Sequence, residues 1–461
     1  MIRRLAPLAA LLATACATPS APPPASVPAG PFAASPVAAL DAVPEDWWRL
    51  YDDPVLDRLV RASLAANADL RVAFANLDGA RAALSQARAL RLPQTMLESA
   101  ATVDNPSAQP SAANVSATDY DVAATASWDI DLFGRLRAGA LAAKADADAS
   151  AAALDGVRVA VVADTVAAYV DLCGATAAGD VARQIVAAQE RSVAAVREQY
   201  RAGEVSPLEV SQAATLLEAA RATLPPFEAA RAGALYRLAT LQGLPPAAAR
   251  GWQLGCTALP RLARPLPVGD GSALLLRRPD IREAERKLAA ASARIGVARA
   301  DLYPRVNLGG AIGLLAGGFA ATASPLISWA FPNQGPVRAK LTQARATERA
   351  ALASWDVAIL RALREVESGL ATLDGEVRRN RALGAASGEA DTYARRAAAR
   401  VRLGDADPLI RYDAERARAN AALQRVQSDI AIGQAQVALF RALGGGWQGA
   451  PVPLAPGVGV R

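Results

Sequence analysis

The chain repeats itself over a period close to half of its length. Residues 67–71 return as residues 278–282, at an offset of 211. Further along, the offset is 201, and it relates Trp128 to Trp329. A period of about 200 residues is far longer than any solenoid repeat, so each copy must be half of a fold rather than one unit of an array. The sequence therefore predicts one body with internal pseudo-twofold symmetry.

The apolar content of the chain is high but includes few aromatic residues. Hydrophobic residues make up 52% of the sequence and aromatic residues only 5%. The apolar residues are therefore mainly Ala, Leu and Val, which favours helices packed closely through small side chains. After the leader, no run of uncharged apolar residues comes near the length that a helix needs to span a bilayer, so no transmembrane helix is expected. The net charge of +6 is too small to indicate a nucleic-acid partner.

The N-terminus has the layout of a secretory signal. Residues 1–15 carry two arginines and then an apolar run, and they end immediately before Cys16. Small residues before a cysteine at this place resemble a bacterial lipoprotein cleavage site, at which the cysteine becomes the lipidated N-terminus, carrying palmitate. The alternative is that Cys16 is an ordinary residue near a standard cleavage site. The residue after this cysteine is Ala17 and not an acidic residue, which resembles lipoproteins that are sent to the outer membrane. Residues 16–45 are rich in Pro and Ala and predict a tether.

Two further cysteines, Cys173 and Cys256, lie in the exported part of the chain. Cys173 continues an apolar stripe at helical spacing, whose other members are Val159, Val162, Val166 and Tyr169. We therefore expect Cys173 to be a buried thiol. A disulfide with Cys256 stays open as an alternative, because an exported protein meets an oxidising compartment.

Two proline-free segments of equal length dominate the chain. They cover residues 136–206 and 337–407 and correspond at the offset of 201. Roughly 60 helical residues give a rod of about 90 Å, which is too long for a compact domain and indicates a coiled-coil-like assembly. Each segment is followed by a glycine and a proline at its turn, which suit a helix end and the start of a returning helix.

The predicted elements form two structural repeats. The first repeat occupies residues 46–250 and the second 267–445, with a linker over 251–266 and a tail over 446–461. Helices are expected over about 54–92, 135–202 and 207–243, the last broken at Pro225-Pro226, and over about 279–302, 337–403 and 408–443.

A segment with period two precedes each rod. Apolar side chains alternate with small or polar ones over residues 120–132 and 306–314. With their partner strands they predict hairpins at about 94–131 and 305–331, the second shorter and interrupted at Pro325. The alternation suits a membrane barrel wall with lipid outside and water inside. An amphipathic sheet on a soluble core would give the same pattern.

Export and lipidation favour the membrane alternative. Four strands cannot close a barrel, because membrane barrels have at least about eight. Three copies of the chain would give about twelve strands and a ring of long helices around one axis. The expected fold class is therefore a mixed α and β membrane protein, internally duplicated, with four transmembrane strands in each chain.

Several motifs are specific when they occur together. They lie at 46–48, at 128–134, at 278–304 and at both glycine turns, so they span nearly the whole chain beyond the tether. In combination they resemble the outer membrane factor family of TolC-like channels, in its lipoprotein branch of NodT and OprM type. The resemblance implies a homotrimer with a twelve-stranded outer-membrane barrel continuous with a long α-helical periplasmic barrel. Residues 331–336, which contain two prolines, depart from the usual junction of strand and rod.

The resemblance also implies a function. The trimer would be a passive, water-filled exit duct for drugs, metals, lipids or other solutes. It would dock on a periplasmic adaptor (a membrane fusion protein) and on an inner-membrane pump of RND type, which supplies the energy.

A gate is implied near the tips of the rods. Leu409 and Asp413 match lumen-facing gate positions, and Arg416 matches a partner of that carboxylate; all three share one helix face. Three copies of Asp413 would form a carboxylate ring that attracts cations. The plain alternative is a solvated pair of Asp413 and Arg416, worth a few tenths of a kcal/mol. Some relatives carry a second Asp where this chain has Ile410, so a single ring is expected.

The tips themselves are candidates for contact with the adaptor. The candidate residues are Arg201, Gly203, Glu204, Arg402, Gly404 and Asp405. Turn chemistry alone would also explain the glycines. Trp128 and Trp329 are candidates for the membrane interface, where aromatic side chains gather, with core packing as the alternative.

The sequence does not indicate an enzyme. It contains zero histidines, so it has no imidazole base and no histidine metal ligand. No cofactor and no metal are expected. Asp129 and Asp131 share the water-facing side of a strand without an implied substrate pocket. The rival reading is a periplasmic coiled-coil lipoprotein, a scaffold or adaptor, which would not need paired strand hairpins.

Overall fold

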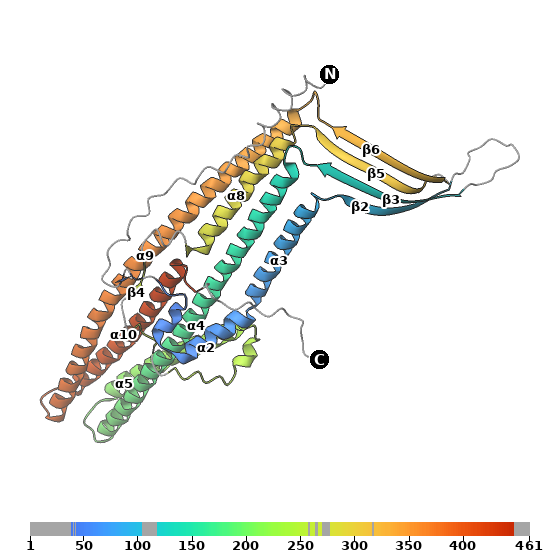
Figure 1. Cartoon of the computed structure of the whole chain (residues 1–461). Helices are drawn as coiled ribbons and strands as arrows, with labels where there is room; N and C mark the ends of the chain where they lie inside the picture. Colours follow the sequence, from blue (N-terminus) through green and yellow to red (C-terminus); the bar gives the residue numbers. More distant parts are fainter. Residues whose placement is uncertain are drawn as a thin grey trace. The chain divides into compact units, whose positions relative to one another are not determined.

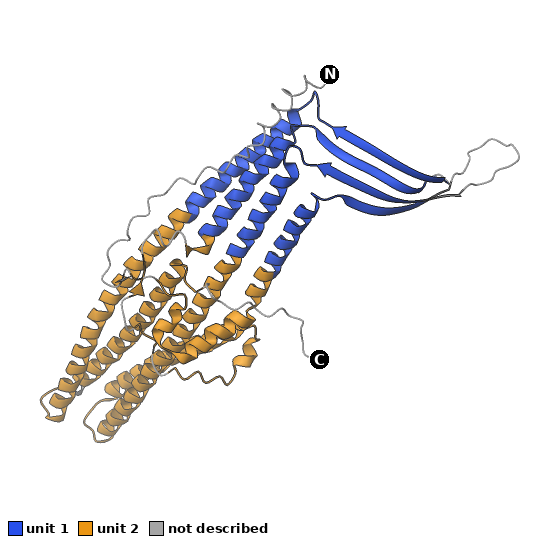
Figure 2. Cartoon of the chain, viewed as in Figure 1, with its two compact units in different colours: residues 1–27, 75–152, 281–358 blue, residues 28–74, 153–280, 359–461 orange. Residues whose placement is uncertain are grey.

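The computed structural model describes residues 38–39, 41, 43–103, 118–256, 259–262, 266–269, 277–315 and 318–446. Two compact units are distinguished in Figure 2: residues 1–27, 75–152 and 281–358 form unit 1, and residues 28–74, 153–280 and 359–461 form unit 2. Each unit takes segments from both repeats. The repeats are therefore folded together rather than as two separate domains.

A four-stranded antiparallel sheet forms in unit 1 (Figure 1). Its strands are β2 (Gln94–Val103), β3 (Thr118–Ile130), β5 (Arg305–Leu315) and β6 (Gly318–Ser328), in the order β2-β3-β5-β6. The hairpins of the two repeats thus join at β3 and β5, and β2 and β6 are the outer strands. The expected interruption at Pro325 is wrong, because β6 runs through it. An outer strand tolerates proline when the missing N–H lies on its open side.

The helices follow the two-repeat order of the sequence. They are α2 (Pro54–Ala66), α3 (Ala68–Ala89), α4 (Arg135–Arg201), α5 (Pro207–Ala222), α6 (Leu224–Leu241), α8 (Pro279–Ala300), α9 (Gly335–Arg402) and α10 (Pro408–Ala442). The single helix expected over 54–92 is wrong, because Asn67 divides it. The Asn67 backbone is extended, and its side chain accepts the N–H groups of Asp69 and Leu70, which caps α3.

Each repeat contains an equivalent hydrogen bond that the sequence did not reveal. The Asn67 side chain donates to the carbonyl oxygen of Leu241 at 3.0 Å, where α6 ends beside the start of α3. In the second repeat, Arg278 donates to the carbonyl oxygen of Ala442 at 2.7 Å, where α10 ends beside the start of α8. These pairs are equivalent at the repeat offsets. In both cases a side chain satisfies a carbonyl group that a helix end leaves without an intrahelical partner.

The core of unit 2 relies on small residues, as the composition predicted. A Cβ atom at Gly174 on α4 would lie 2.5 Å from Cγ1 of Ile430 on α10, and one at Gly433 would lie 2.8 Å from Cγ1 of Val170. The two helices can therefore approach this closely only through glycine. The predicted apolar stripe on α4 is buried, with Val162 and Val166 fully covered. One stretch of α4 is apolar enough to span a membrane, but most of it is buried inside the structure, as in a core helix.

The end of the predicted tether is part of the fold. Ala38–Ala39 (β1) pairs in parallel with Leu266–Pro267 (β4), and Val43 is buried. A short 3-10 helix, Trp47–Tyr51 (η3), follows, and Trp47 stacks on Phe440 of α10 with ring centroids 4.3 Å apart. The tether expected over 16–45 therefore ends earlier than its composition suggested. Cys16 and the signal over 1–15 lie outside the described residues.

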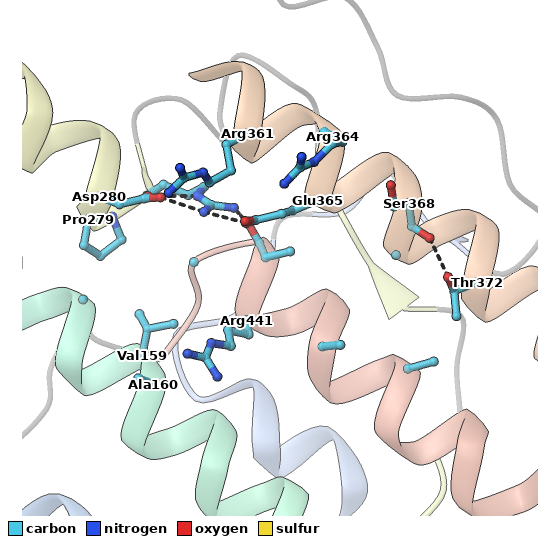
Figure 3. A pocket seen from close by; sticks show the side chains of 17 residues that line it. Val159, Ala160, Pro279, Asp280, Arg361, Arg364, Glu365, Ser368, Thr372 and Arg441 are labelled. Atoms are coloured by element: carbon cyan, nitrogen blue, oxygen red, sulfur yellow. Dashed lines mark hydrogen bonds and ion pairs between the residues drawn. The ribbon is translucent and has the colours of Figure 1, made fainter. Parts of the chain in front are cut away.

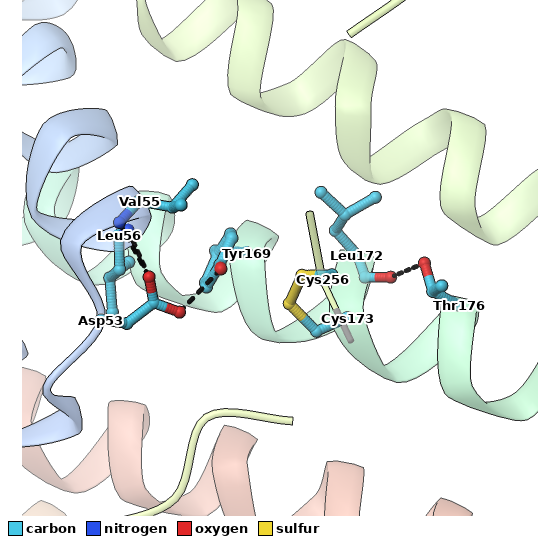
Figure 4. The surroundings of a disulfide bond; sticks show 8 residues. All are labelled: Asp53, Val55, Leu56, Tyr169, Leu172, Cys173, Thr176 and Cys256. Atoms are coloured by element: carbon cyan, nitrogen blue, oxygen red, sulfur yellow. Dashed lines mark hydrogen bonds between the residues drawn. A yellow bond between two sulfur atoms is a disulfide. The ribbon is translucent and has the colours of Figure 1, made fainter. Parts of the chain in front are cut away.

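The expectation of a free thiol at Cys173 is wrong. Cys173 is buried, as predicted, but it forms a disulfide with Cys256 (Figure 4), with Cα atoms 5.1 Å apart. The bond fixes the linker after the first repeat to α4. One turn away, the Tyr169 hydroxyl donates to Asp53 at 2.7 Å, and burial together with this carboxylate raises the pKa of Tyr169. Periodicity located the helix face but could not identify the partner, which is 83 residues away.

Replacing Cys256 should lower stability. Cys256→Ser releases the cross-link and should reduce the free energy of unfolding by ~2–4 kcal/mol, because the unfolded chain regains conformational freedom. Thermal unfolding followed by circular dichroism measures the change. A reductant should lower the melting temperature of the wild-type protein and leave that of the variant unchanged. An unchanged wild-type curve in reductant would show that the disulfide contributes nothing.

Candidate functional site: the sheet faces and the hairpin tips

The pairing of the strands places the alternating apolar residues of both repeats on one face of the sheet. Val122 lies opposite Leu314, and Trp128 lies opposite Leu308. Residues directly opposite in neighbouring strands share a face. The outer strands extend the same apolar face with Leu97, Phe319 and Ile327. The apolar face is therefore continuous across all four strands of the sheet.

This apolar face has no protein cover within the described chain. Leu97 is 75% exposed, Phe319 76% and Ile327 68%. A contiguous exposed apolar patch of this kind indicates contact with lipid or with another protein. The opposite face carries mainly small or polar residues, for example where Ala123 lies opposite Gly313, together with Met96 and Leu326 on the outer strands. One face therefore suits hydrocarbon, and the other suits water.

The two candidate interface tryptophans make equivalent hydrogen bonds. Trp128 Nε1 donates to the carbonyl oxygen of Arg91 at 3.1 Å, and Trp329 Nε1 donates to that of Leu302 at 3.0 Å. Both acceptors lie between a helix and the first strand of a hairpin. Each ring stays partly exposed, at 40% for Trp128 and 48% for Trp329. Each tryptophan thus fixes a junction of helix and strand while part of its ring stays exposed, with the Trp329 ring stacked on Phe331.

Asp129 and Asp131 have local structural roles. Asp131 accepts the N–H groups of Leu136 and Arg137 at 2.9 and 2.8 Å, so it caps the first turn of α4. Asp129 pairs with Arg135. At the matching junction of the second repeat, Asn333 accepts the N–H of Gly335 instead.

The hairpin tips have the same backbone geometry in both repeats. At the first tip, the N–H of Glu204 donates to the carbonyl oxygen of Gln199 at 2.9 Å; at the second, the N–H of Asp405 donates to that of Arg400 at 3.0 Å. Between them Gly203 and Gly404 take φ values of +77° and +72°. This is the Schellman closure of a helix end, which requires a residue in the left-handed region.

The first tip is capped by Ser206 and Glu209. The Ser206 side chain accepts the N–H of Leu208, and the Glu209 carboxylate accepts the backbone N–H of Ser206 at 3.0 Å, which completes a capping box. The hydrogen bond from the Ser206 hydroxyl is the main cause that holds the pKa of Glu209 below its ordinary value. Ile410 occupies the equivalent position in the second tip, so that tip relies on Asp407, which accepts the N–H of Leu409.

The candidate adaptor contacts differ in how firmly they are held. Arg201 pairs with Glu198 at 2.5 Å, and Asp405 accepts from Arg400 at 3.1 Å. Glu204 is exposed, and within the described residues no ion pair holds its side chain. The two tips thus present unlike charge patterns on the same backbone.

The three predicted gate residues lie on the first turns of α10. Leu409 is 39% exposed, and Arg416 Nη2 lies 2.9 Å from Oδ1 of Asp413, with both of these side chains largely exposed. Ile410 packs against Ala394 and Ala414 in the core of the hairpin. The structure therefore presents Leu409, Asp413 and Arg416 at the surface of the protomer and keeps Ile410 inside.

The described residues contain no cluster of three or more potential metal ligands. An uncovered amphipathic sheet and two long helical hairpins with exposed, charged tips are the features of a protomer of an outer-membrane channel.

Comparison with known proteins agrees with this class. The family model described as outer membrane efflux protein matches residues 59–244 and 271–445. The chain is 31% identical to the toluene efflux pump outer membrane protein TtgC of Pseudomonas putida over 93% of its own length and 91% of that protein. It is 32% identical to the outer membrane protein OprJ of Pseudomonas aeruginosa over 89% of this chain and 88% of OprJ.

A solved structure of the outer-membrane channel OprN superimposes with a TM-score of 0.84 at 34% identity, covering 93% of this chain and 99% of that one. The chain belongs to the outer membrane efflux protein family. The alternative of a coiled-coil scaffold that never enters the membrane is therefore wrong.

The tip glycines should be sensitive to a side chain despite open surroundings. No atom lies within 4 Å of a Cβ placed at Gly203 or Gly404, so Gly404→Ala should cost about 1 kcal/mol through backbone strain alone. Gly388→Ala, in the interior of α9 with equally open surroundings, should be neutral or stabilising. Thermal unfolding compares the two variants. Equal effects would contradict the strain argument.

The first tip should loosen in acid. A carboxylate with a lowered pKa contributes stability that is present above its unfolded pKa and is lost as the pH falls through its folded pKa. Protection of the amides of residues 206 and 208–210 against hydrogen exchange, corrected for intrinsic rates, should therefore fall as Glu209 is protonated. In Glu209→Ala the protection should be low throughout this pH range. An equal pH dependence in the variant would assign the effect to another group.

Proposed function

We propose that three copies of this chain form a passive duct through which a tripartite efflux system exports solutes across the outer membrane. Three sheets of four strands supply a twelve-stranded wall, within the size range of membrane barrels. The observation that carries this proposal is the strand register, which places the apolar series of both repeats on one uncovered face. That face contacts lipid, and the small and polar face lines water.

The tips dock on a periplasmic adaptor, and an RND-type inner-membrane pump supplies the energy. Arg201, Glu204, Arg402 and Asp405 make the charged contacts, and the two glycines leave the tip backbone open to a partner. The unlike charges of the two tips provide two different surfaces for such a partner. The pump selects the cargo, because a wide wetted duct selects little.

The resting seal lies at the first turns of α10. Three copies of Leu409 narrow the duct, and three copies of Asp413, each held by its own Arg416, form the charged ring. An exposed pair at this spacing contributes only ~0.2–1 kcal/mol to stability, so its main effect is on the ions that pass.

Two further features hold the trimer in the membrane. Trp128 and Trp329 place their exposed ring faces at the boundary between lipid and periplasm. Cys16 carries a lipid anchor at the mature N-terminus. The chain has no enzymatic activity of its own, because a duct driven by a pump needs none.

Removing the gate charges should open the channel. In planar lipid bilayers the double variant Asp413→Ala/Arg416→Ala should conduct severalfold more current than the wild-type trimer, with little change in thermal stability. The pair Glu376→Ala/Arg379→Ala is a matched control, because it removes an ion pair of the same spacing from the middle of α9.

The control should conduct like the wild-type protein. If neither the wild-type protein nor the gate variant conducts, the duct is refuted. If the control opens the channel as much as the gate variant does, only the position of the gate is wrong.

A further inference from the structure

A pocket in unit 2 shares no lining residue with the tips or with the strands of the sheet. It has a volume of about 760 Å³ and lies among α4, the start of α8, α9 and the end of α10 (Figure 3). Cavities of about 300–1,000 Å³ are typical of small-molecule sites. Every lining residue belongs to the same compact unit.

Three glycines line this pocket: Gly156, Gly369 and Gly444. A Cβ atom at Gly369 would lie 3.1 Å from Cδ1 of Leu439, and one at Gly444 would lie 3.0 Å from Cγ of Arg278, so these glycines let the surrounding chain come close. At Gly156 the nearest atom would be 3.9 Å away, which leaves the α4 side of the pocket open. A side chain at Gly369 or Gly444 would therefore crowd the residues around the pocket.

Two of the four arginines that line the pocket have carboxylate partners. Buried Arg278 bonds to both oxygens of Asp280, to Glu365 at 2.8 Å and to the carbonyl oxygen of Ala442. Burial lowers the pKa of Arg278, but the bonds to these two carboxylates outweigh it and leave the pKa above its ordinary value. Arg441 pairs with Asp164 at 3.3 Å.

The other two arginines face the pocket without such partners. Arg361 and Arg364 lie one turn apart on α9, and Figure 3 shows them on the side opposite Arg441. Within the described part of the chain, neither forms a hydrogen bond or an ion pair. The two carboxylates of the lining, Asp280 and Glu365, are already bonded to Arg278. The pocket therefore has uncompensated positive charge.

We propose that this pocket binds a small organic anion with at least two carboxylate or phosphate groups. A guanidinium group matches such oxyanions with two parallel hydrogen bonds, which a point charge cannot reproduce. Arg361 and Arg364 hold one anionic group, and Arg441 faces a second group across the pocket. The site goes beyond the duct function and does not depend on conduction, so either can fail alone.

Citrate and pyrophosphate are suitable probes for the two anion chemistries. Isothermal titration of the full-length protein in detergent at low ionic strength should give one saturable site per chain for at least one of them, and no binding of uncharged sorbitol. The double variant Arg361→Gln/Arg364→Gln should weaken binding at least tenfold, and Arg361→Lys/Arg364→Lys should weaken it less.

The matched control is Arg378→Gln/Arg381→Gln, with the same charge change and spacing on α9 but outside the pocket. It should bind the probe like the wild-type protein. If the pocket variant fails to fold, Ser368→Glu is decisive, because it adds a carboxylate to the lining and should abolish binding.

Three outcomes would overturn the proposal. The first is the absence of saturable binding to the wild-type protein. The second is equal weakening in the control, which would indicate general attraction to a basic protein. The third is a pocket variant that loses its oligomeric state, which would assign Arg361 and Arg364 to contacts between copies of the chain.

Discussion

The open edges of the sheet constrain everything else in this molecule. In the described chain, β2 and β6 each have one neighbouring strand, so the outer row of backbone N–H and C=O groups on each has no partner there. In hydrocarbon every such group must be satisfied by protein, because no water is present to replace it. The apolar face of the same strands is itself uncovered. A sheet with these two properties is stable in a membrane only when further copies of the chain close it into a barrel.

The helix ends α6 and α10 also leave backbone groups open, and here side chains of the same chain satisfy them. Asn67 and Arg278 occupy equivalent positions and satisfy equivalent helix-end carbonyl groups, but with different chemistry. The amide of Asn67 needs no counter-charge. The buried guanidinium group of Arg278 needs a counter-charge, and it pairs with Asp280 and Glu365. In the second repeat, Arg278 and its partners Asp280 and Glu365 thereby form part of the wall of the basic pocket.

Sequence reasoning was strongest where the signal is periodic and long. It predicted the strand pairs, the long helices that became α4 and α9, and the turns at Gly203 and Gly404, because apolar spacing and turn residues act locally. It was weaker where the outcome depends on distant partners: it left the Cys173–Cys256 disulfide only as an alternative, and it missed the two tryptophan hydrogen bonds and the convergence of four arginines. It also missed the cap at Asn67, although an Asn preceding Asp69 is a helix-start signal. The roles assigned to Asp413 and to the tips came from family resemblance and stay predictions.

The mass of the detergent-solubilised protein tests the central claim most directly. Native mass spectrometry of the unmodified, purified chain should give a particle of three protomers, with no stable monomer after the detergent is removed. A folded monomer that remains soluble without detergent would show that the sheet edges need no partner, and it would contradict the account.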